Sequence, residues 1–477
     1  RNRGIWRDYD EFNPDIKSTA LLKMCIDAGV VILFNTVSFA SIVDADRKNI
    51  IKGVAASNGE EISIVLGRYV IDATGDGDIA VFAGADFTYG NGRDMFTYWA
   101  SLAQYTSPEK YKNNFSSTVV VSDINDYTRF IRAGRRRGDN TYDHGTYLAP
   151  RESRHIKGLY EVNLKDIVSF RNYDDSVYTC FSNYDPKGKV TADMVYGGVL
   201  PPPISSAIPL RSLLPVDTDG NYMEGVLVAG KAISCTHNAF PGIRMQTDLQ
   251  HQGAVLGLIA AYAIGKNADV LDLDIRSLQK EIYDATDDDL AVAEQKSLTE
   301  DDIVSQINEN ERLDWVDLPF TDEIKQMPVT IRAAVADSGS ILPELENEFA
   351  HEQNTLRKSL LARFILWHGC DVATDFILNE IRNEFFEQGG LPERKGSIMC
   401  VQLLPDHGVM PEIVYKLNLL AWSSRSEIYK PFEEVLKRLS CTERDYSDIK
   451  KGIYHYIESF TYVAERTCVR EFIPMLN

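Results

Sequence analysis

Three polar side chains in this sequence could carry acid–base or substrate-binding chemistry. His237 lies in a loop after a predicted strand, and a histidine can exchange protons near neutral pH. Arg154 could hold an anionic or hydroxyl-bearing substrate, with Glu152 as its pairing partner. Two structural interpretations stay open, because His237 could be bonded to backbone and the Arg154–Glu152 pair could be an ordinary ion pair.

The other histidines and the cysteines are weaker candidates. His144 and His155 rank below His237, and a structural role is expected for His251 because it lies on a predicted helix. No His-Glu-x-x-His motif and no nucleophile–histidine–acid signature is present, although triads are assembled in space. The seven cysteines are far apart and contain no Cys-x-x-Cys pair, which predicts free or buried thiols and no metal site.

The stretch RYVIDATGDGDIAVFAGA, residues 68–85, contains the pattern Gly-x-Gly-x-x-Ala beginning at Gly75. A β-branched run precedes it and an apolar, helix-like run follows, as in a dinucleotide phosphate loop. Asp76 and Asp78 argue against that role, because they would repel a pyrophosphate at the helix N-terminus. A calcium loop is also disfavoured, because its twelfth position is Ala83 instead of a bidentate glutamate.

Helices and strands must position these residues, and the sequence around the motif predicts an alternation of the two. A helix is expected from Ser18, its N-cap, to Gly29, followed by a buried strand at residues 30–34. An Asn-Gly pair at residues 58–59 predicts a hairpin between two β-rich runs. A further strand then leads into the Gly-x-Gly pattern.

The same alternation returns in the second half of the chain. A buried strand is predicted to end at Gly230, and a later helix to end at Gly265. On that helix Gly253, Gly257 and Ala261 share a face with almost no side chain. Each glycine costs a helix up to about 1 kcal/mol. We therefore expect a sheet or a cofactor to approach this backbone closely.

Composition narrows the class of protein. The chain has 477 residues, 44% of them hydrophobic and 25% charged, which is typical of globular proteins with two or three domains. A net charge of −20 argues against nucleic acid as a partner. No stretch approaches the roughly 20 apolar residues of a membrane span.

Three segments together resemble one family of flavoproteins. Residues 70–85 resemble the strand-end segment of two-dinucleotide-type, glutathione-reductase-like FAD-dependent oxidoreductases, in which Ile-Asp-Ala-Thr-Gly-Asp-Gly-Asp recurs. Residues 150–167 resemble the Arg-Glu-Ser-Arg segment of that family, and residues 208–265 its second FAD segment. The helical residues after about 330 resemble, much more weakly, the HEAT-like tail of some members.

The resemblance implies FAD as the cofactor and places its contacts. The backbone of Ala73, Thr74 and Gly75 would pass beside FAD, while the aspartates that follow cap the next helix. Lys231 stands where the family commonly has arginine, which keeps the charge but loses the bidentate fork. The other cofactor contacts implied are Val37, Gly230, Arg244, Met245 and Gln246.

The resemblance also implies catalytic roles. His237 would transfer a proton over the flavin, with Arg244 and Arg154 as further catalytic residues. The positive end of the glycine-rich helix would face the flavin pyrimidine edge, where negative charge accumulates on reduction. Hydride would pass between flavin N5 and a small organic substrate, such as a hydroxylated or sugar-derived compound.

We expect an α/β fold of the FAD/NAD(P)-binding, Rossmann-like class, with an inserted α+β substrate layer and an all-α C-terminal domain. The family's phosphate loop is expected to precede Arg1, so that this chain alone would bind FAD weakly or not at all. The expected domains are a partial FAD-binding domain (1–86), a substrate layer (87–205), a second FAD segment (206–283), an acidic connector (284–328) and a helical domain (329–477).

Two alternative functions stay open. A non-catalytic scaffold derived from a flavoprotein could bind a protein partner through the helical C-terminal domain. A polysaccharide-processing enzyme is the third hypothesis, and no paired-carboxylate motif favours it.

Overall fold

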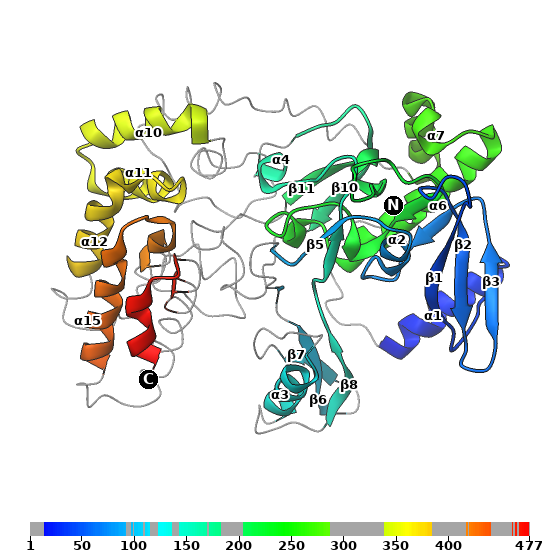
Figure 1. The fold of residues 1–477 in the computed structure, drawn as a ribbon, viewed down its shortest axis with the longest axis horizontal. Coiled ribbons are helices and arrows are strands. Elements are labelled where there is room, and N and C mark those ends of the chain that lie inside the picture. The colour runs from blue at the N-terminus through cyan, green and yellow to red at the C-terminus, as the bar shows by residue number, and fades with distance from the viewer. Residues whose placement is uncertain are drawn as a thin grey trace.

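The elements of the chain form three groups in the computed structural model (Figure 1). Strands and helices of residues 14–91 lie beside those of residues 204–286, a small sheet with one helix extends below them, and the C-terminal helices gather on the left of the view. The structure describes residues 14–91, 97–98, 100–107, 110–114, 123–135, 143–168, 171–182, 204–286, 338–383, 416–417, 419–439, 460, 463–464 and 467–476.

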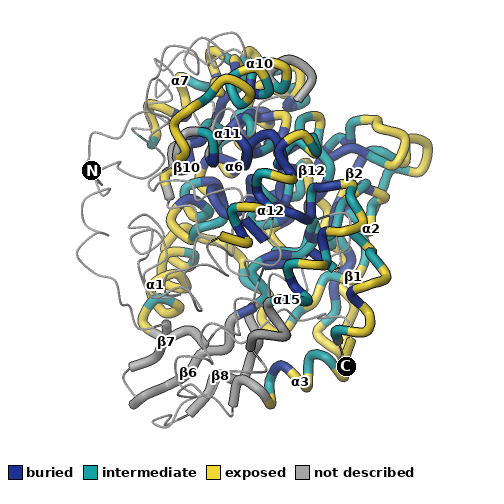
Figure 2. The backbone as a smooth tube through the Cα atoms, turned by 90° about the vertical axis from the view of Figure 1, so that its left-hand side faces the viewer, coloured by how far each residue is buried: buried dark blue, intermediate teal, exposed yellow. Residues whose placement is uncertain are grey.

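The first group begins with a helix and an antiparallel meander. Helix α1 (Pro14–Asp27) is followed by β1 (Val37–Val43), β2 (Ile51–Ser57) and β3 (Ile62–Leu66), which pair in the order β1-β2-β3. The turn between β2 and β3 begins at the predicted Asn-Gly pair, so the predicted hairpin is confirmed. Helix α1 and β3 are largely exposed (Figure 2).

Two predictions for this region are wrong. Helix α1 begins at Pro14 and not at a Ser18 cap, because proline fits the first turn of a helix, where its missing N–H is not needed. Residues 30–34 form no strand, because no described strand pairs with them. The predicted helix stop is confirmed: Gly29, at φ 72°, and Val30 bond back to carbonyls of the last helical turn.

A parallel strand pair forms the centre of the first group. Strands β4 (Val70–Asp72) and β12 (Val226–Val228) run parallel, with Val228 opposite Asp72. The polypeptide therefore leaves both strands at the same edge of the pair. Helix α2 (Asp78–Phe82) follows β4. All three side chains of β12 are buried, as its continuous apolar run predicts.

The long glycine-containing helix differs from the prediction at two points. Helix α6 (Gln246–Lys266) ends at Asn267, at φ 52°, and not at Gly265, since asparagine tolerates the left-handed conformation. Gly253 and Gly257 are exposed, and no described atom lies within 4 Å of a Cβ placed on either. The expected close approach of a sheet to this face is therefore absent from the described residues.

The substrate-layer segment contains antiparallel strands, consistent with the alternating runs in its sequence. A separate sheet has the order β7-β6-β8 with α3 beside it, and β5 pairs with β9. The bounds are β5 (Phe87–Tyr89), β6 (Ser101–Ser107), β7 (Lys110–Asn114), α3 (Ile124–Arg135), β8 (Asp143–Ala149), β9 (Arg154–Ile156) and α4 (Leu164–Val168).

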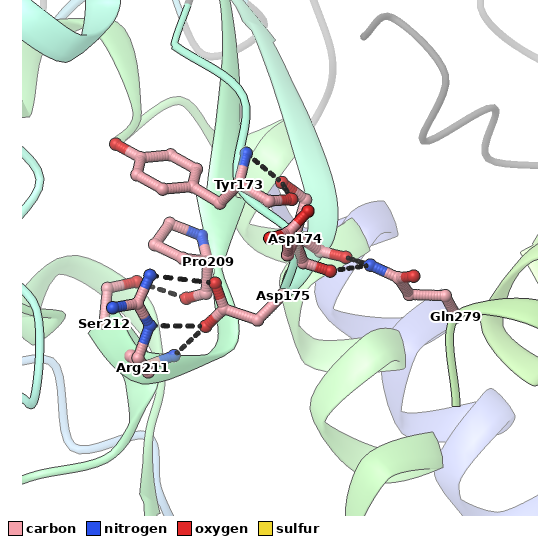
Figure 3. Close-up of polar contacts among 8 residues, drawn as sticks. Tyr173, Asp174, Asp175, Pro209, Arg211, Ser212 and Gln279 are labelled. Atoms are coloured by element: carbon pink, nitrogen blue, oxygen red, sulfur yellow. Dashed lines mark hydrogen bonds and ion pairs between the residues drawn. The ribbon is translucent and has the colours of Figure 1, made fainter. Parts of the chain in front are cut away.

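A second antiparallel pair, β10 (Ser176–Ser182) with β11 (Ile204–Pro209), joins this layer to the first group. Arg211, which follows β11, forms two side-chain bonds with Asp175, at 2.9 and 3.1 Å (Figure 3). The Gln279 amide on α7 (Ile275–Thr286) donates to the backbone carbonyls of Asp174 and Ser176. These contacts fix the start of β10 against α7.

The described elements of the C-terminal region are helices, as the sequence predicts. Its α-helices are α10 (Ser338–His351), α11 (Thr355–Trp367), α12 (Thr374–Arg382) and α15 (Lys430–Leu439). The predicted connector lies outside the described residues from 287 onward, and its first three residues belong to α7. No helix in the described parts of the chain is long and apolar enough to cross a bilayer.

Short 3-10 helices connect the main elements. They are η3 (Leu210–Leu213), η4 (Gly230–Ala232), η5 (Phe240–Gly242), η6 (Val270–Asp272), η8 (Asp371–Ala373), η10 (Leu420–Trp422), η11 (Ser426–Tyr429) and η12 (Arg470–Leu476).

Candidate active site

The turn after β4 is built by one buried carboxylate. Asp72 Oδ1 accepts hydrogen bonds from the Thr74 amide at 3.1 Å and the Thr74 hydroxyl at 2.7 Å. Its Oδ2 accepts from the amide of Ala80, in the first turn of α2, at 2.9 Å. Thr74 Oγ1 in turn accepts from the Asp78 amide at 3.0 Å.

This arrangement corrects the predicted roles of the aspartates in the Gly-x-Gly pattern. Asp72 and Thr74 satisfy the free N–H groups of α2, whereas Gly77 occupies the N-cap position without a side-chain bond. Asp76 and Asp78 do not cap the helix. The reason is geometric, because the left-handed conformation of Gly77, at φ 69°, turns the chain so that the strand-end carboxylate reaches the helix.

A second turn lies next to the first at the same edge of the parallel pair. The Ala229 amide donates to the Asp72 carbonyl at 2.9 Å, and Gly230 follows at φ 75°. The Gly230 amide donates to Gln252 Oε1 on α6, and Gln252 donates to the Tyr178 hydroxyl at 2.8 Å. The structure thus brings the predicted cofactor-contact glycines, Gly75 and Gly230, to one sheet edge.

Lys231 lies between this edge and the substrate layer. Its Nζ donates to the Pro150 carbonyl at 2.9 Å, and its Cε is 3.7 Å from a Cβ built on Gly75. Burial lowers the pKa of Lys231 below the usual lysine range, and the Asp76 carboxylate partly opposes that shift. The amine is therefore partly desolvated, and it lies beside the turn.

Glu152 joins two histidines in the interior. Its Oε1 lies 2.7 Å from His237 Nδ1 and 2.8 Å from His155 Nε2, and its Oε2 accepts from the Tyr98 amide at 2.8 Å. The exposed fractions of the side chains are 0% for Glu152, 1% for His155 and 5% for His237. A buried carboxylate held by three donors is an arrangement for orienting imidazoles.

Aromatic rings fix both imidazoles in place. The Tyr98 ring stacks on His237 with centroids 4.2 Å apart and planes 5° from parallel, and its hydroxyl donates to the His237 carbonyl at 3.1 Å. The Phe240 ring meets the His155 imidazole edge-on at 5.0 Å. On the far side of His155, Nδ1 lies 3.4 Å from Cys235 Sγ.

The charges of this cluster follow from its contacts. Burial by itself raises the pKa of Glu152, but the His237 charge and the hydrogen bonds from both histidines lower it to about 2. Burial lowers the pKa of His155, but the Cys235 sulfur and the Glu152 carboxylate raise it to about 10. Burial raises the pKa of the Cys235 thiol. At neutral pH the cluster contains an ionised Glu152 beside a protonated His155.

Arg154 does not pair with Glu152, which corrects the predicted ion pair. Arg154 Nη1 lies 2.6 Å from Asp78 Oδ1 and 3.3 Å from the Asp76 carbonyl, and its guanidinium is 5.4 Å from the Phe87 ring centroid. Arg154 and His155 are successive residues of β9 and so point to opposite faces, and His155, not Arg154, is the residue that meets Glu152.

The remaining predicted contacts cluster at the start of α6, with one exception. Met245 is at the N-cap position of α6 and makes no capping bond, but its Sδ accepts from Arg244 Nη1 at 3.9 Å. Gln246 Oε1 accepts from Lys17 Nζ at 2.7 Å. Arg244 lies with its guanidinium carbon 6.0 Å from the Phe240 ring centroid. Val37 begins β1, away from these turns in sequence, and is 70% exposed.

A cavity of about 590 Å³ lies at the opposite end of the parallel pair, lined by Arg68, Tyr69 and Gly225 among others. These residues precede β4 and β12. Ligands of open α/β sheets bind outside the carboxyl ends of the strands. The candidate site is therefore the edge formed by Gly75 and Gly230, not this cavity.

Comparison with known proteins identifies the family of this chain. A family model described as FAD dependent oxidoreductase matches residues 1–147 and 126–282, so the two matches span more than half of the chain. The chain belongs to the FAD-dependent oxidoreductase family. It is an oxidoreductase, and FAD is its cofactor. Comparison with curated proteins and with solved structures gave no match.

The residues present fit a bound FAD. Ala73 and Thr74 are exposed at the sheet edge, and no described heavy atom lies within 4 Å of a Cβ placed on Gly230. Backbone at both turns is thus open to a cofactor. The half-buried Lys231 amine and the α6 N-terminus, which has no side-chain cap, suit the negative charge of a dinucleotide or a reduced flavin.

Sequence reasoning missed the Glu152–His155–His237 cluster. Glu152 and His237 are 85 positions apart, and the nearer Arg154 offered a simpler partner for the carboxylate. The one available signal was the spacing of three between Glu152 and His155 within the Arg-Glu-Ser-Arg-His run. No metal-binding group of three histidine, cysteine or acidic side chains is found among the described residues.

Proposed function

We propose that this chain transfers hydride between FAD and a small organic substrate, with a hydroxylated or sugar-derived compound as the substrate class. When bound, FAD supplies a two-electron hydride acceptor and donor. The observation that carries the proposal is the placement of a buried, carboxylate-bonded His237 six residues after Lys231, on the segment that leaves the FAD-facing edge of β12.

The cofactor is proposed to lie against the two glycine turns. Backbone of Ala73, Thr74 and Gly75 and of Gly230 would contact it, because small residues at exposed strand ends permit close approach. The cations Lys231 and Arg244 and the α6 N-terminus would offset its negative charge. The remaining proposed contacts are Val37, Met245 and Gln246.

The proton that accompanies hydride transfer is assigned to His237. Its imidazole is bonded through Nδ1 to Glu152 and stacked on Tyr98, so it is held in one orientation. Arg154 is proposed to orient the substrate, with its guanidinium held by Asp78 at the turn after β4. A scaffold function for the chain is not favoured, because the matching family consists of oxidoreductases. A protein partner for the C-terminal helices stays a prediction.

Two measurements test the proposal. The purified native protein should absorb between about 350 and 500 nm as an oxidised flavin does, and substrate should bleach that band. His237→Ala should lower kcat by about 10² to 10⁴ fold, the usual contribution of a general acid or base. His351→Ala, on an exposed histidine of α10, is the matched control and should leave kcat unchanged.

A protein that stays colourless when FAD is added would contradict the cofactor-binding proposal. Full turnover in His237→Ala would contradict only the proton-transfer assignment. Small hydroxylated compounds that fail to bleach a bound flavin would contradict the substrate class.

A further inference from the structure

The contacts of Glu152 determine which nitrogen of His237 can exchange protons. An ionised carboxylate only accepts hydrogen bonds, so both imidazoles that meet Oε1 must donate to it. His237 therefore carries its proton on Nδ1 when neutral. Nε2 is then the nitrogen through which the ring accepts or releases a proton.

The contacts of the cluster prevent the His237 imidazole from rotating by 180° and exchanging its two nitrogens. Tyr98 stacks on one face of His237, and the same residue's backbone amide holds Glu152 Oε2 at 2.8 Å. His155 donates to Glu152 Oε1 from the other side at 2.8 Å. Each oxygen of the carboxylate is thus fixed by a group that does not move with His237.

We propose that Glu152 is a positioning residue that fixes His237 in its Nδ1–H tautomer, so that proton exchange with the substrate takes place at Nε2, and that His155 holds the carboxylate in this orientation. The inference rests on the proposed function of His237 in proton transfer. The same holds for carboxylate-bonded histidines in metal sites and catalytic triads. There the carboxylate fixes the proton on one ring nitrogen, which leaves the other nitrogen to bind the metal or to exchange a proton.

The charges around His237 fit this role. Glu152 supplies the one described carboxylate that bonds its ring, His155 supplies a buried cation behind that carboxylate, and Tyr98 supplies a neutral aromatic face. Lys231 is the nearby basic residue from η4, and the charge of Glu152 acts to raise its pKa. Cys235 Sγ lies 3.4 Å from His155 Nδ1, the ring nitrogen that does not contact Glu152.

Glu152→Gln provides a sharp test, because the two side chains have the same shape. The Tyr98 amide would still bond the glutamine carbonyl oxygen, which places the glutamine NH₂ where Oε1 was. This NH₂ donates to both imidazoles that met Oε1, so His237 Nδ1 must accept and its proton moves to Nε2. His155 Nε2 must accept as well, and a neutral His155 then keeps its proton on Nδ1, toward Cys235. The variant should therefore reverse the tautomer.

The experiment is ¹⁵N NMR of the full-length protein labelled at histidine, with His237 assigned by comparison with His237→Ala. We expect an Nδ1–H signal for neutral His237 in the unmodified protein and an Nε2–H signal in Glu152→Gln. Glu161→Gln removes an exposed carboxylate nearby and should leave the tautomer unchanged. An Nε2–H tautomer in the unmodified protein, which needs no variant to fold, would overturn the inference.

Kinetics separate this inference from the proposed function. Glu152→Gln should lower kcat about 10² fold or more while KM and the Kd for FAD stay within about twofold, because positioning of a proton-transfer group affects the chemical step. Retention of the Nδ1–H tautomer or of full kcat in this variant would overturn the positioning role. If the tautomer reverses but His237→Ala keeps full turnover, the tautomer inference holds and the proton-transfer function of His237 fails.

Discussion

The Arg154 guanidinium and the Asp78 carboxylate lie 2.6 Å apart and connect β9 of the substrate layer to the turn after β4. Asp78 belongs to the pattern that resembles a phosphate loop. Its negative charge is paired with Arg154 of the same chain. Both side chains are about one-third exposed, at 30% and 38%. The pair therefore aligns the substrate layer with the sheet edge and leaves part of Arg154 accessible.

Removing this ion pair should destabilise the protein only slightly. A double-mutant cycle with Asp78→Ala and Arg154→Ala should give a coupling energy of about 0.5 to 1 kcal/mol, because solvent screens the pair. Denaturant unfolding measures it. If Arg154 also orients the substrate, Arg154→Ala raises KM more than Asp78→Ala does. Equal effects of both variants on KM would show that Arg154 acts only through the pair.

Asp72 should be essential for stability, in contrast to Asp76. Asp72→Ala removes three hydrogen bonds at a residue that is 1% exposed and should cost about 2 kcal/mol or more in the free energy of unfolding. Asp76→Ala, in the same turn, is the matched control and should change it by less than about 0.5 kcal/mol. Equal costs would contradict the assignment of Asp72 as the cap of α2.

Gly77 should not tolerate a side chain. A Cβ at this residue would lie 2.5 Å from two atoms of Ile156, which is buried, and the residue has a positive φ of 69°. Gly84→Ala is the control, because Gly84 also has positive φ, 102°, but no described atom within 4 Å. Gly77→Ala should be less stable than Gly84→Ala by about 1 to 3 kcal/mol, the range for overpacking. Similar melting temperatures for the two would argue against tight packing here.

The buried Glu152–His155 pair should make stability depend on pH at both ends. The folded-state pKa of Glu152, about 2, is below its usual 4.5, so its stabilisation is present above pH 4.5 and is lost as pH falls toward 2. The pKa of His155, about 10, is above its usual 6.5, so its stabilisation is complete below pH 6.5 and is lost as pH rises toward 10.

The stability difference between the unmodified protein and His155→Gln should therefore shrink as pH rises from about 6 to about 10. Urea unfolding over this range measures the difference. A difference that stays constant would show that His155 is neutral in the folded protein.

Lys231 should contribute to cofactor affinity but not to stability. Lys231→Met removes a half-buried amine whose desolvation opposes its charged form, so the free energy of unfolding should stay equal or rise. The Kd for FAD should rise about tenfold, corresponding to one charge-assisted contact of roughly 1.4 kcal/mol. Lys157→Met, on a partly exposed lysine paired with Asp86, is the control. Flavin fluorescence titration gives the Kd of each variant for FAD. Equal Kd values for Lys231→Met and Lys157→Met would contradict the role of Lys231.

The sequence by itself determined several of the local elements and the family. The Asn-Gly hairpin, the buried run of β12 and the C-terminal helices follow from short-range periodicity and turn residues, and each is present in the structure. The two FAD segments were recognisable because a strand that ends in small residues has a distinctive pattern. Asp76 and Asp78 also argue against a phosphate loop, since electrostatic repulsion needs no tertiary information, and this stays a prediction.

Only the tertiary structure decided how the polar groups are paired. Asp72 caps α2 from eight positions away, Arg154 selects Asp78 over the nearby Glu152, and Glu152 bonds His237 across 85 positions. Local pattern carries no information on these choices, because they depend on which side chains are buried together when separate segments pack. A buried carboxylate must find donors wherever the fold supplies them, and here the fold supplies two histidines and a backbone amide.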